Sequence, residues 1–209
     1  MKIFYVLHIR DTELADCVDA IRFICNPGEK QRAHLTVRGP YRRRIDVSAI
    51  SRKIVGDTIS INSVGNFFDS GQNTVFFKCA ATELKNVWNK PHYPFNPHIT
   101  LYDGNSQEFA HRLFNLMNNY SYSLKFRAEE LEPIEALKGQ QCFSLALAFN
   151  PKLVCRISGE DISPASASQL PDEHRLRVVE ALCRHLSTSC ETAPPQNHTC
   201  QQSLRPANL

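Results

Sequence analysis

The tetrapeptide His34-Leu35-Thr36-Val37 recurs in pattern as His98-Ile99-Thr100-Leu101, since both read histidine, apolar residue, threonine, apolar residue. The residue frequencies of this 209-residue chain give a chance expectation of roughly 0.06 such tetrapeptides, so two copies are informative. On a β-strand, residues two apart point to the same side and their neighbours point to the other. Each stretch therefore predicts a strand that is buried on its apolar face and presents a histidine and a threonine together on the opposite face.

The segments around the two motifs predict a chain of class α+β. Apolar stretches with β-branched and aromatic residues indicate strands, whereas apolar residues three or four apart behind a capping residue such as Asp11 indicate helices. We expect strands over residues 2–9, 33–38, 58–64, 74–79, 98–102, 121–126, 130–138 and 142–149, and helices over 11–25, 47–55, 82–88 and 106–118. Each half of the chain then contains one strand that bears the motif.

The composition of the chain argues against a membrane-spanning protein and against a secreted one. Hydrophobic residues make up 42% of the chain and charged residues 22%, which is close to the globular average. No segment approaches the ~18 consecutive apolar residues that a membrane-spanning helix needs. The short apolar start of the chain runs directly into Arg10 and Asp11, unlike a signal peptide. The 8 cysteines form no Cys-x-x-Cys pair, and we expect a cytoplasmic protein with reduced thiols and no contact with a membrane.

The chain changes character after residue 150. Residues 158–168 are rich in serine and alanine, and we expect the tail over 151–209 to be partly disordered. Within the tail, a helix at about 172–187 is predicted by an apolar stripe at helical spacing, made of Leu176, Val179, Leu182, Cys183 and Leu186. The stripe can dock on the domain formed by residues 1–150 or on a protein partner.

The repeated histidine and threonine suit phosphodiester chemistry. Imidazole has an unperturbed pKa near ~6.5, so of His34 and His98 one can accept a proton while the other, protonated, donates one. The hydroxyl groups of Thr36 and Thr100 can donate hydrogen bonds to the oxygens of a phosphate in the transition state. These four residues are therefore the candidate catalytic set, and the arrangement requires no metal.

Five further residues near the motifs are candidates for binding substrate, namely Arg38, Tyr41, Arg42, Arg43 and Tyr102. By strand alternation, Arg38 shares the histidine face of the first motif strand and Tyr102 that of the second. An arginine at this place can meet a phosphate, and a tyrosine can stack on a base. The alternatives are ion pairs with surface carboxylates for the arginines and packing against the sheet for Tyr102.

The two motifs resemble the signature of the two-histidine (2H) phosphoesterases, a family that includes bacterial 2′-5′ RNA ligases and RNA 2′,3′-cyclic phosphodiesterases. The resemblance covers about residues 1–149 and includes the aromatic-rich first strand and the Gly39-Pro40 turn after the first motif. It implies a bilobal fold, with two antiparallel sheets facing each other across a central cleft, helices outside and the motifs on facing strands. It also implies that His34 is the general acid and His98 the base, an order that two such similar motifs leave open.

We therefore expect metal-independent hydrolysis of a nucleotide or RNA phosphodiester, either a 2′,3′-cyclic phosphate or a 2′-5′ linkage, with no cofactor. The partner is then a nucleotide, an oligonucleotide or an RNA end. One alternative is a 2′-5′ RNA ligase that works through the reverse reaction. Another is a noncatalytic nucleotide or RNA sensor that recruits a protein through the C-terminal helix.

Overall fold

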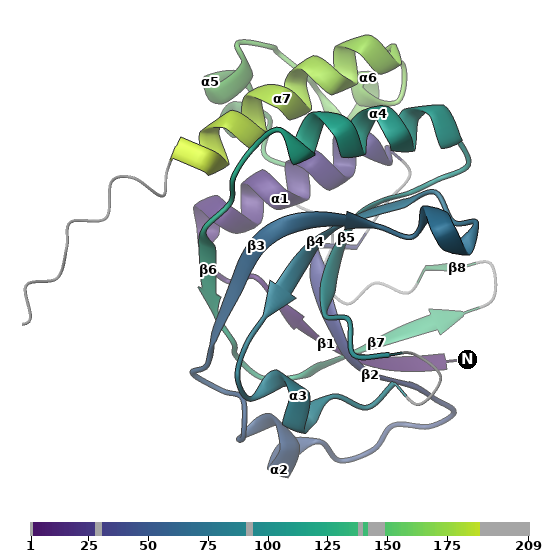
Figure 1. Ribbon diagram of the computed structural model, residues 1–209, viewed down its shortest axis with the longest axis vertical. Coiled ribbons are helices and arrows are strands. Elements are labelled where there is room, and N and C mark those ends of the chain that lie inside the picture. Colours follow the sequence, from purple (N-terminus) through teal and green to yellow (C-terminus); the bar gives the residue numbers. More distant parts are fainter. Residues whose placement is uncertain (1, 28–30, 91–93, 138–139, 142–148, 189–209) are drawn as a thin grey trace, which may run out of the picture.

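Eight strands form one curled antiparallel sheet in the order β6-β3-β4-β5-β2-β1-β7-β8, among the residues that the computed structural model describes, which are 2–27, 31–90, 94–137, 140–141 and 149–188 (Figure 1). The strands are β1 (Lys2–His8), β2 (His34–Tyr41), β3 (Thr58–Asn66), β4 (Thr74–Ala80), β5 (His98–Asp103), β6 (Leu124–Arg127), β7 (Glu132–Leu137) and β8 (Gln140–Gln141). The helices are α1 (Thr12–Cys25), α2 (Ser48–Ser51), α3 (Leu84–Val87), α4 (Gln107–Asn118), α5 (Pro151–Ser158), α6 (Pro164–Ala167) and α7 (Asp172–Thr188), with a 3₁₀ turn η1 (Phe68–Ser70).

The predicted class, α+β, is confirmed, with local differences. The helix expected over 47–55 is a single turn, α2, and the strand expected over 121–126 begins only at Leu124. The strand expected over 142–149 falls mainly on residues outside the described part of the chain. Within the described part, no helix has the length and apolar character needed to cross a membrane.

The two motif strands lie next to each other in the sheet. They pair through one residue pair, Leu35 with Ile99, and this pair joins the half β6-β3-β4-β5 to the half β2-β1-β7-β8. We expected two separate sheets with the motifs on facing strands, and the structure differs because the motif strands bond directly. Their apolar residues are fully buried, as the alternation predicts, and belong to one core with α1.

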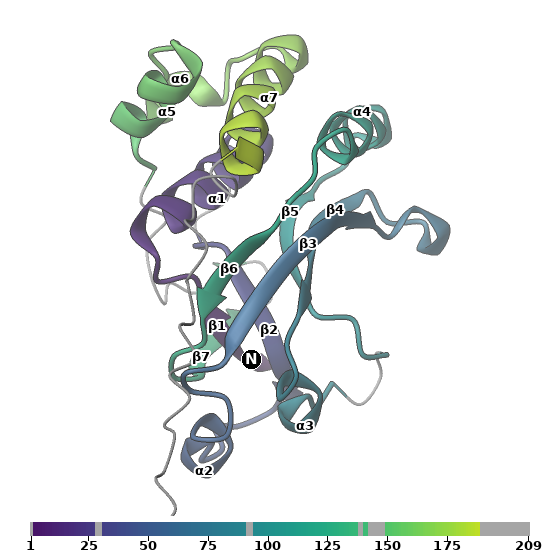
Figure 2. The same cartoon turned by 60° about the vertical axis from the view of Figure 1, so that its left-hand side comes forward.

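Helix α1 covers the centre of this core. The Asp11 side chain caps the helix by accepting a hydrogen bond of 2.9 Å from the backbone N–H of Leu14. From Ala15 to Cys25 all but one of the side chains are buried, because α1 is packed between the sheet and the C-terminal helices (Figures 1 and 2). A helix with so few exposed positions is a central element of the fold.

Residues 151–188 are packed on the body of the domain rather than extended from it. Helix α7 contacts α1, α4 and α5, and the predicted apolar stripe is buried in the same core as the motif strands (Figure 2). The serine-rich stretch, expected to be partly disordered, contains the short helix α6, in which Ser163 and Ser166 cap each other. The stripe is therefore covered by this chain and is not open to a protein partner. Residues 189–209 lie outside the described part.

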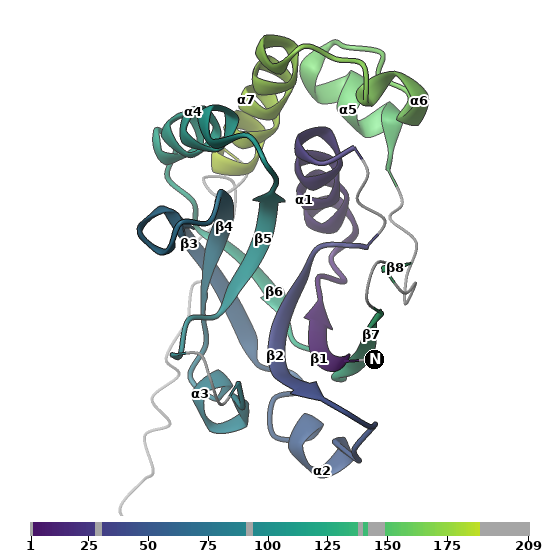
Figure 3. The same cartoon turned by 90° about the vertical axis from the view of Figure 1, so that its right-hand side faces the viewer.

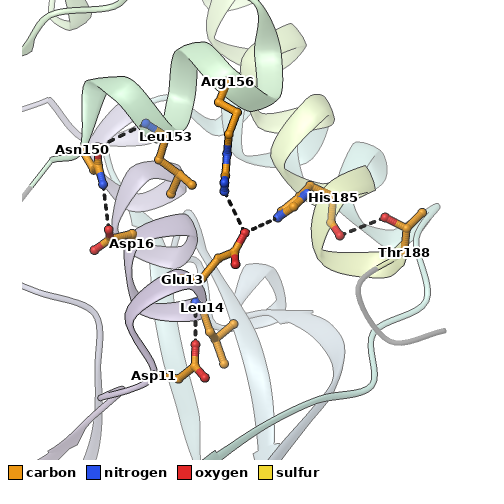
Figure 4. Close-up of polar contacts among 9 residues, drawn as sticks. All are labelled: Asp11, Glu13, Leu14, Asp16, Asn150, Leu153, Arg156, His185 and Thr188. Carbon is orange, nitrogen blue, oxygen red and sulfur yellow. Dashed lines mark hydrogen bonds and ion pairs between the residues drawn. The ribbon is translucent and has the colours of Figure 1, made fainter. Parts of the chain in front are cut away.

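Polar contacts also fasten the C-terminal helices to α1. The Glu13 carboxylate accepts from Nη2 of Arg156 at 2.8 Å and lies 3.1 Å from Nε2 of His185 (Figure 4). One turn along, the Asn150 side-chain amide donates to Asp16 at 2.9 Å. Exposed pairs of this kind contribute little to stability, so the buried stripe holds the helices in place.

Replacing the fully buried Leu182 of α7 by alanine should lower the free energy of unfolding of the whole chain by about 2–5 kcal/mol, because the leucine leaves a cavity in the shared core. Glu13→Gln, which removes only the exposed ion pairs, should cost less than about 1 kcal/mol. Urea unfolding followed by circular dichroism measures both. A separate, early transition for the C-terminal helices in Leu182→Ala would contradict the shared core.

Candidate active site

Strands β2 and β5 lie next to each other in the sheet (Figure 3). A pocket of about 210 Å³ lies where they meet. It is lined by Arg22, Asn26, Gln31, His34, Thr36, His98, Thr100 and Asp103. The four residues predicted as the catalytic set are therefore brought together in one place. Three of the other lining residues come from α1 and the segment that follows it, so the pocket is closed by the helix as well as by the sheet.

The pocket exists because β2 and β5 separate beyond their single residue pair. In a regular ladder, the next carbonyl groups of β5 would accept from β2. Here Nη1 of Arg22 donates to the carbonyl of Thr100 at 2.6 Å, and the amide of Asn26 donates to the carbonyl of Leu101 at 2.6 Å. Side chains of α1 and its C-cap thus satisfy the backbone of β5 and keep the strands apart.

The two motif histidines are oriented in the same way. Nδ1 of His34 lies 2.8 Å from the carbonyl of Arg32, and Nδ1 of His98 lies 2.7 Å from the carbonyl of Asn96. A carbonyl only accepts, so Nδ1 carries the proton in both rings. In the neutral ring, Nε2 then has the free lone pair. Each motif therefore sets its own tautomer through the backbone two residues earlier.

The surroundings of the two rings differ. The His98 ring packs against Phe76 and Phe67, with ring centroids 4.8 and 5.2 Å away. The His34 ring instead has the imidazole of His8 at 6.0 Å. Burial lowers the pKa of His34 to about 3, helped by the charge of Arg22, and burial also lowers the pKa of His98. Both imidazoles are therefore neutral near pH 7 in the empty pocket.

Arg22 is the main site residue that sequence reasoning missed. It is 6% exposed, lies in the last turn of α1 and brings the guanidinium to the pocket. The sequence does contain a sign of its role, because Arg22 is a charged residue inside the apolar run 20–25. A helix that is apolar on all sides has no face in water on which to place a charge. A buried arginine in such a run indicates a polar target within the fold.

A β-bulge in β5 changes which residue faces the pocket. Thr100 pairs with Phe76 and Tyr102 with Val75, so Leu101 is an extra residue without a partner on β4. After the bulge the alternation is shifted by one position. The prediction that Tyr102 shares the histidine face is therefore wrong, because Tyr102 is buried in the core against Phe109. Asp103 lines the pocket instead and accepts a hydrogen bond of 2.8 Å from Thr74.

The structure does not bring the other predicted substrate-binding residues to the pocket. Nη1 of Arg38 donates to the carbonyl of Val87 at 2.7 Å, and Tyr41 packs edge-on against Tyr5. Arg42 and Arg43 are exposed beyond the far end of β2, roughly 25 Å from His34 at 3.3 Å per residue. Arg42 and Arg43 are therefore out of reach of a phosphate between the motifs.

Comparison of the sequence with protein-family models and with curated proteins finds no match. The chemistry of the site is accordingly inferred from its residues. They offer two imidazoles, two hydroxyls, one guanidinium and one carboxylate. Over the described residues, no group of three or more His, Cys, Asp or Glu side chains is placed to hold a metal ion.

The lowered pKa of His34 predicts a stability that depends on pH. The folded state keeps the ring neutral, whereas the unfolded chain protonates it near pH 6.5, so stability is complete above that pH and is lost as the pH falls toward 3. At pH 5 the loss from His34 is up to about 2 kcal/mol. Urea unfolding at pH 7 and pH 5 should therefore show a smaller pH dependence for His34→Gln than for the wild type. Equal dependence in the two proteins would contradict the neutral ring.

Proposed function

We propose that this chain hydrolyses a nucleotide or RNA phosphodiester without a metal, with His34 and His98 exchanging the protons. The observation that carries the proposal is the matched pair of imidazoles in one pocket, each held by a backbone carbonyl at Nδ1. This arrangement leaves Nε2 of both rings for reacting atoms. A 2′,3′-cyclic phosphate or a 2′-5′ linkage is the substrate bond that fits the resemblance to 2H phosphoesterases.

The reaction needs one neutral and one protonated imidazole. An anionic phosphate entering the pocket favours protonation, so a substrate raises the low pKa of one of the two rings. The neutral ring then takes a proton from a water molecule as its oxygen bonds to phosphorus. The protonated ring gives its proton to the ribose oxygen as the bond between that oxygen and phosphorus breaks. The two rings end with exchanged protonation states, which solvent resets.

The remaining polar groups of the pocket are suited to hold the phosphate. Thr36 and Thr100 share the strand faces of the histidines and can donate to non-bridging oxygens. The Arg22 guanidinium supplies the positive charge that Arg38 was expected to supply. Asp103 at the exposed side of the pocket can accept a hydrogen bond from a ribose hydroxyl.

The architecture also fits the family resemblance. The motif strands divide the sheet into two four-stranded halves, and this division supports the proposal because the resemblance to 2H phosphoesterases implies two lobes. At about 210 Å³, the pocket fits a phosphodiester and an adjacent ribose better than a whole nucleotide. The base of the substrate would then lie outside the pocket.

Alanine at His34 or at His98 should lower turnover by roughly 10²–10⁴-fold, because each removes a proton-transfer group. The assay is a panel of 2′,3′-cyclic nucleotides, 2′-5′ and 3′-5′ dinucleotides and cyclic dinucleotides, in the presence of EDTA. Hydrolysis of one class that survives EDTA and is lost in both variants is the expected result. Binding of a nucleotide without any turnover would point to a sensor, and accumulation of joined product from cyclic-phosphate ends would point to a ligase.

Arg22→Gln should reduce kcat/KM by roughly 100-fold on the substrate found in that panel, because the transition-state charge loses its cation. Arg22→Lys should recover part of the loss, since lysine keeps the positive charge but lacks the planar guanidinium with its several N–H donors. Arg52→Gln, an exposed arginine next to α2, is the matched control and should be unchanged. Thermal unfolding of all three variants shows whether activity is lost because the charge is missing or because the fold is weakened without the hydrogen bond to the Thr100 carbonyl. Equal activity of Arg22→Gln and the control would contradict the role of Arg22.

A further inference from the structure

A third histidine lies directly behind the site. His8 is the last residue of β1, and its Cα is the register partner of His34 on β2. The two imidazole rings are 6.0 Å apart at 67°. His8 is 5% exposed and is not part of the pocket lining, so it can act only through His34.

The His8 ring is costly for the fold. Neither ring nitrogen has a hydrogen bond of good geometry among the described residues and both are inaccessible to solvent, while the backbone of Ala33 is close enough to favour a proton on the ring. A buried imidazole without partners is destabilising, and an apolar residue of similar size would avoid that cost. Unsatisfied buried groups of this kind are typical of functional sites.

Burial lowers the pKa of His8, as it lowers that of His34, but the charges around the two rings favour a proton on His8 over one on His34. Glu132 of β7 faces His8 and is itself paired with Arg10. Arg22 of α1 faces His34. Arg32, which precedes β2, is near both rings but is paired with Asp19 at 2.7 Å. A proton on one of two buried imidazoles at this distance makes protonation of the other less favourable, and these neighbours direct the first proton to His8 rather than to His34.

Among the described residues, no second imidazole packs against the ring of His98 as His8 packs against that of His34. The His98 ring is enclosed by the phenyl rings of Phe67 and Phe76. Burial lowers the pKa of His98 and the charge of Lys90 lowers it further, while the exposed Lys78 lies at the register position on β4. Asp103, on the same strand, contributes a negative charge to the pocket. Among the described residues on this side of the pocket, His98 is the imidazole that a proton brought in by a phosphate can occupy.

We propose that His8 is a positioning residue that, together with burial and Arg22, keeps His34 neutral as the proton acceptor and leaves His98 as the proton donor. This assignment rests on the proposed function and reverses the order implied by the family resemblance. It follows from the neighbours of the two rings, because the hydrogen bonds of the two motifs are alike.

The test replaces His8 by phenylalanine, which fills the same space without a titrating group. NMR titration of the imidazole Cε1–H signals in the free protein should show His34 titrating about one pH unit higher in His8→Phe, with His98 unchanged. His8→Gln serves as a second variant that retains polarity, in case the phenylalanine is not accommodated. His185→Phe on α7 is the matched control and should leave both signals in place. An unchanged titration of His34 in both His8 variants overturns the proposal.

The pH profile of kcat/KM then distinguishes the roles. A proton acceptor governs the acidic limb, so His8→Phe should move that limb to higher pH and leave the basic limb in place. Movement of the basic limb instead would make His34 the donor and overturn the assignment, and no movement would make His8 merely structural. If the NMR shift is found but the wild type hydrolyses nothing, the link between His8 and His34 is supported and the proposed hydrolysis is overturned.

Discussion

The site depends on one residue pair, Leu35 with Ile99, through which the two halves of the sheet are joined. More pairs between β2 and β5 would close the space between the motifs, and fewer would leave the halves without a common core. The carbonyl groups released where the strands separate need donors, and α1 supplies them through Arg22 and Asn26. The requirement to satisfy the backbone thus brings a cation to the place where a phosphate would bind.

Local backbone contacts make the two histidines alike, and tertiary packing makes them different. Each motif holds its ring through a carbonyl two residues earlier, which is a property of the tetrapeptide and its approach segment. The aromatic neighbours of the rings come from β1 on one side and from β4 and the connection that precedes it on the other. A chain with two nearly identical motifs can therefore have two chemically distinct imidazoles.

Short-range periodicity predicted the four motif residues and their common face, because strand alternation is enforced by burial of the apolar neighbours. It could not predict Asp103 in place of Tyr102, since the bulge at Leu101 is visible only in the pairing with β4. Arg22 was missed because it comes from a helix, and strand alternation gives no indication that a helical side chain faces the motifs. Arg42 and Arg43 were assigned to the site because they follow the first motif closely in the sequence. Each residue of an extended strand adds about 3.3 Å, so a few residues are enough to take a side chain out of reach of the histidine.

The packing of α7 against α1 has a consequence for the smallest unit that can hold the pocket. Helix α1 is enclosed by the sheet on one side and by the C-terminal helices on the other, so its last turn is supported from both. A fragment that ends at residue 150 contains both motifs, yet it would expose the outer side of α1 to water. The helix that separates β2 from β5 would then lose its backing. The smallest part of the chain that can hold the pocket is therefore the part that keeps α1 covered on both sides. It extends at least to residue 188, well past the second motif.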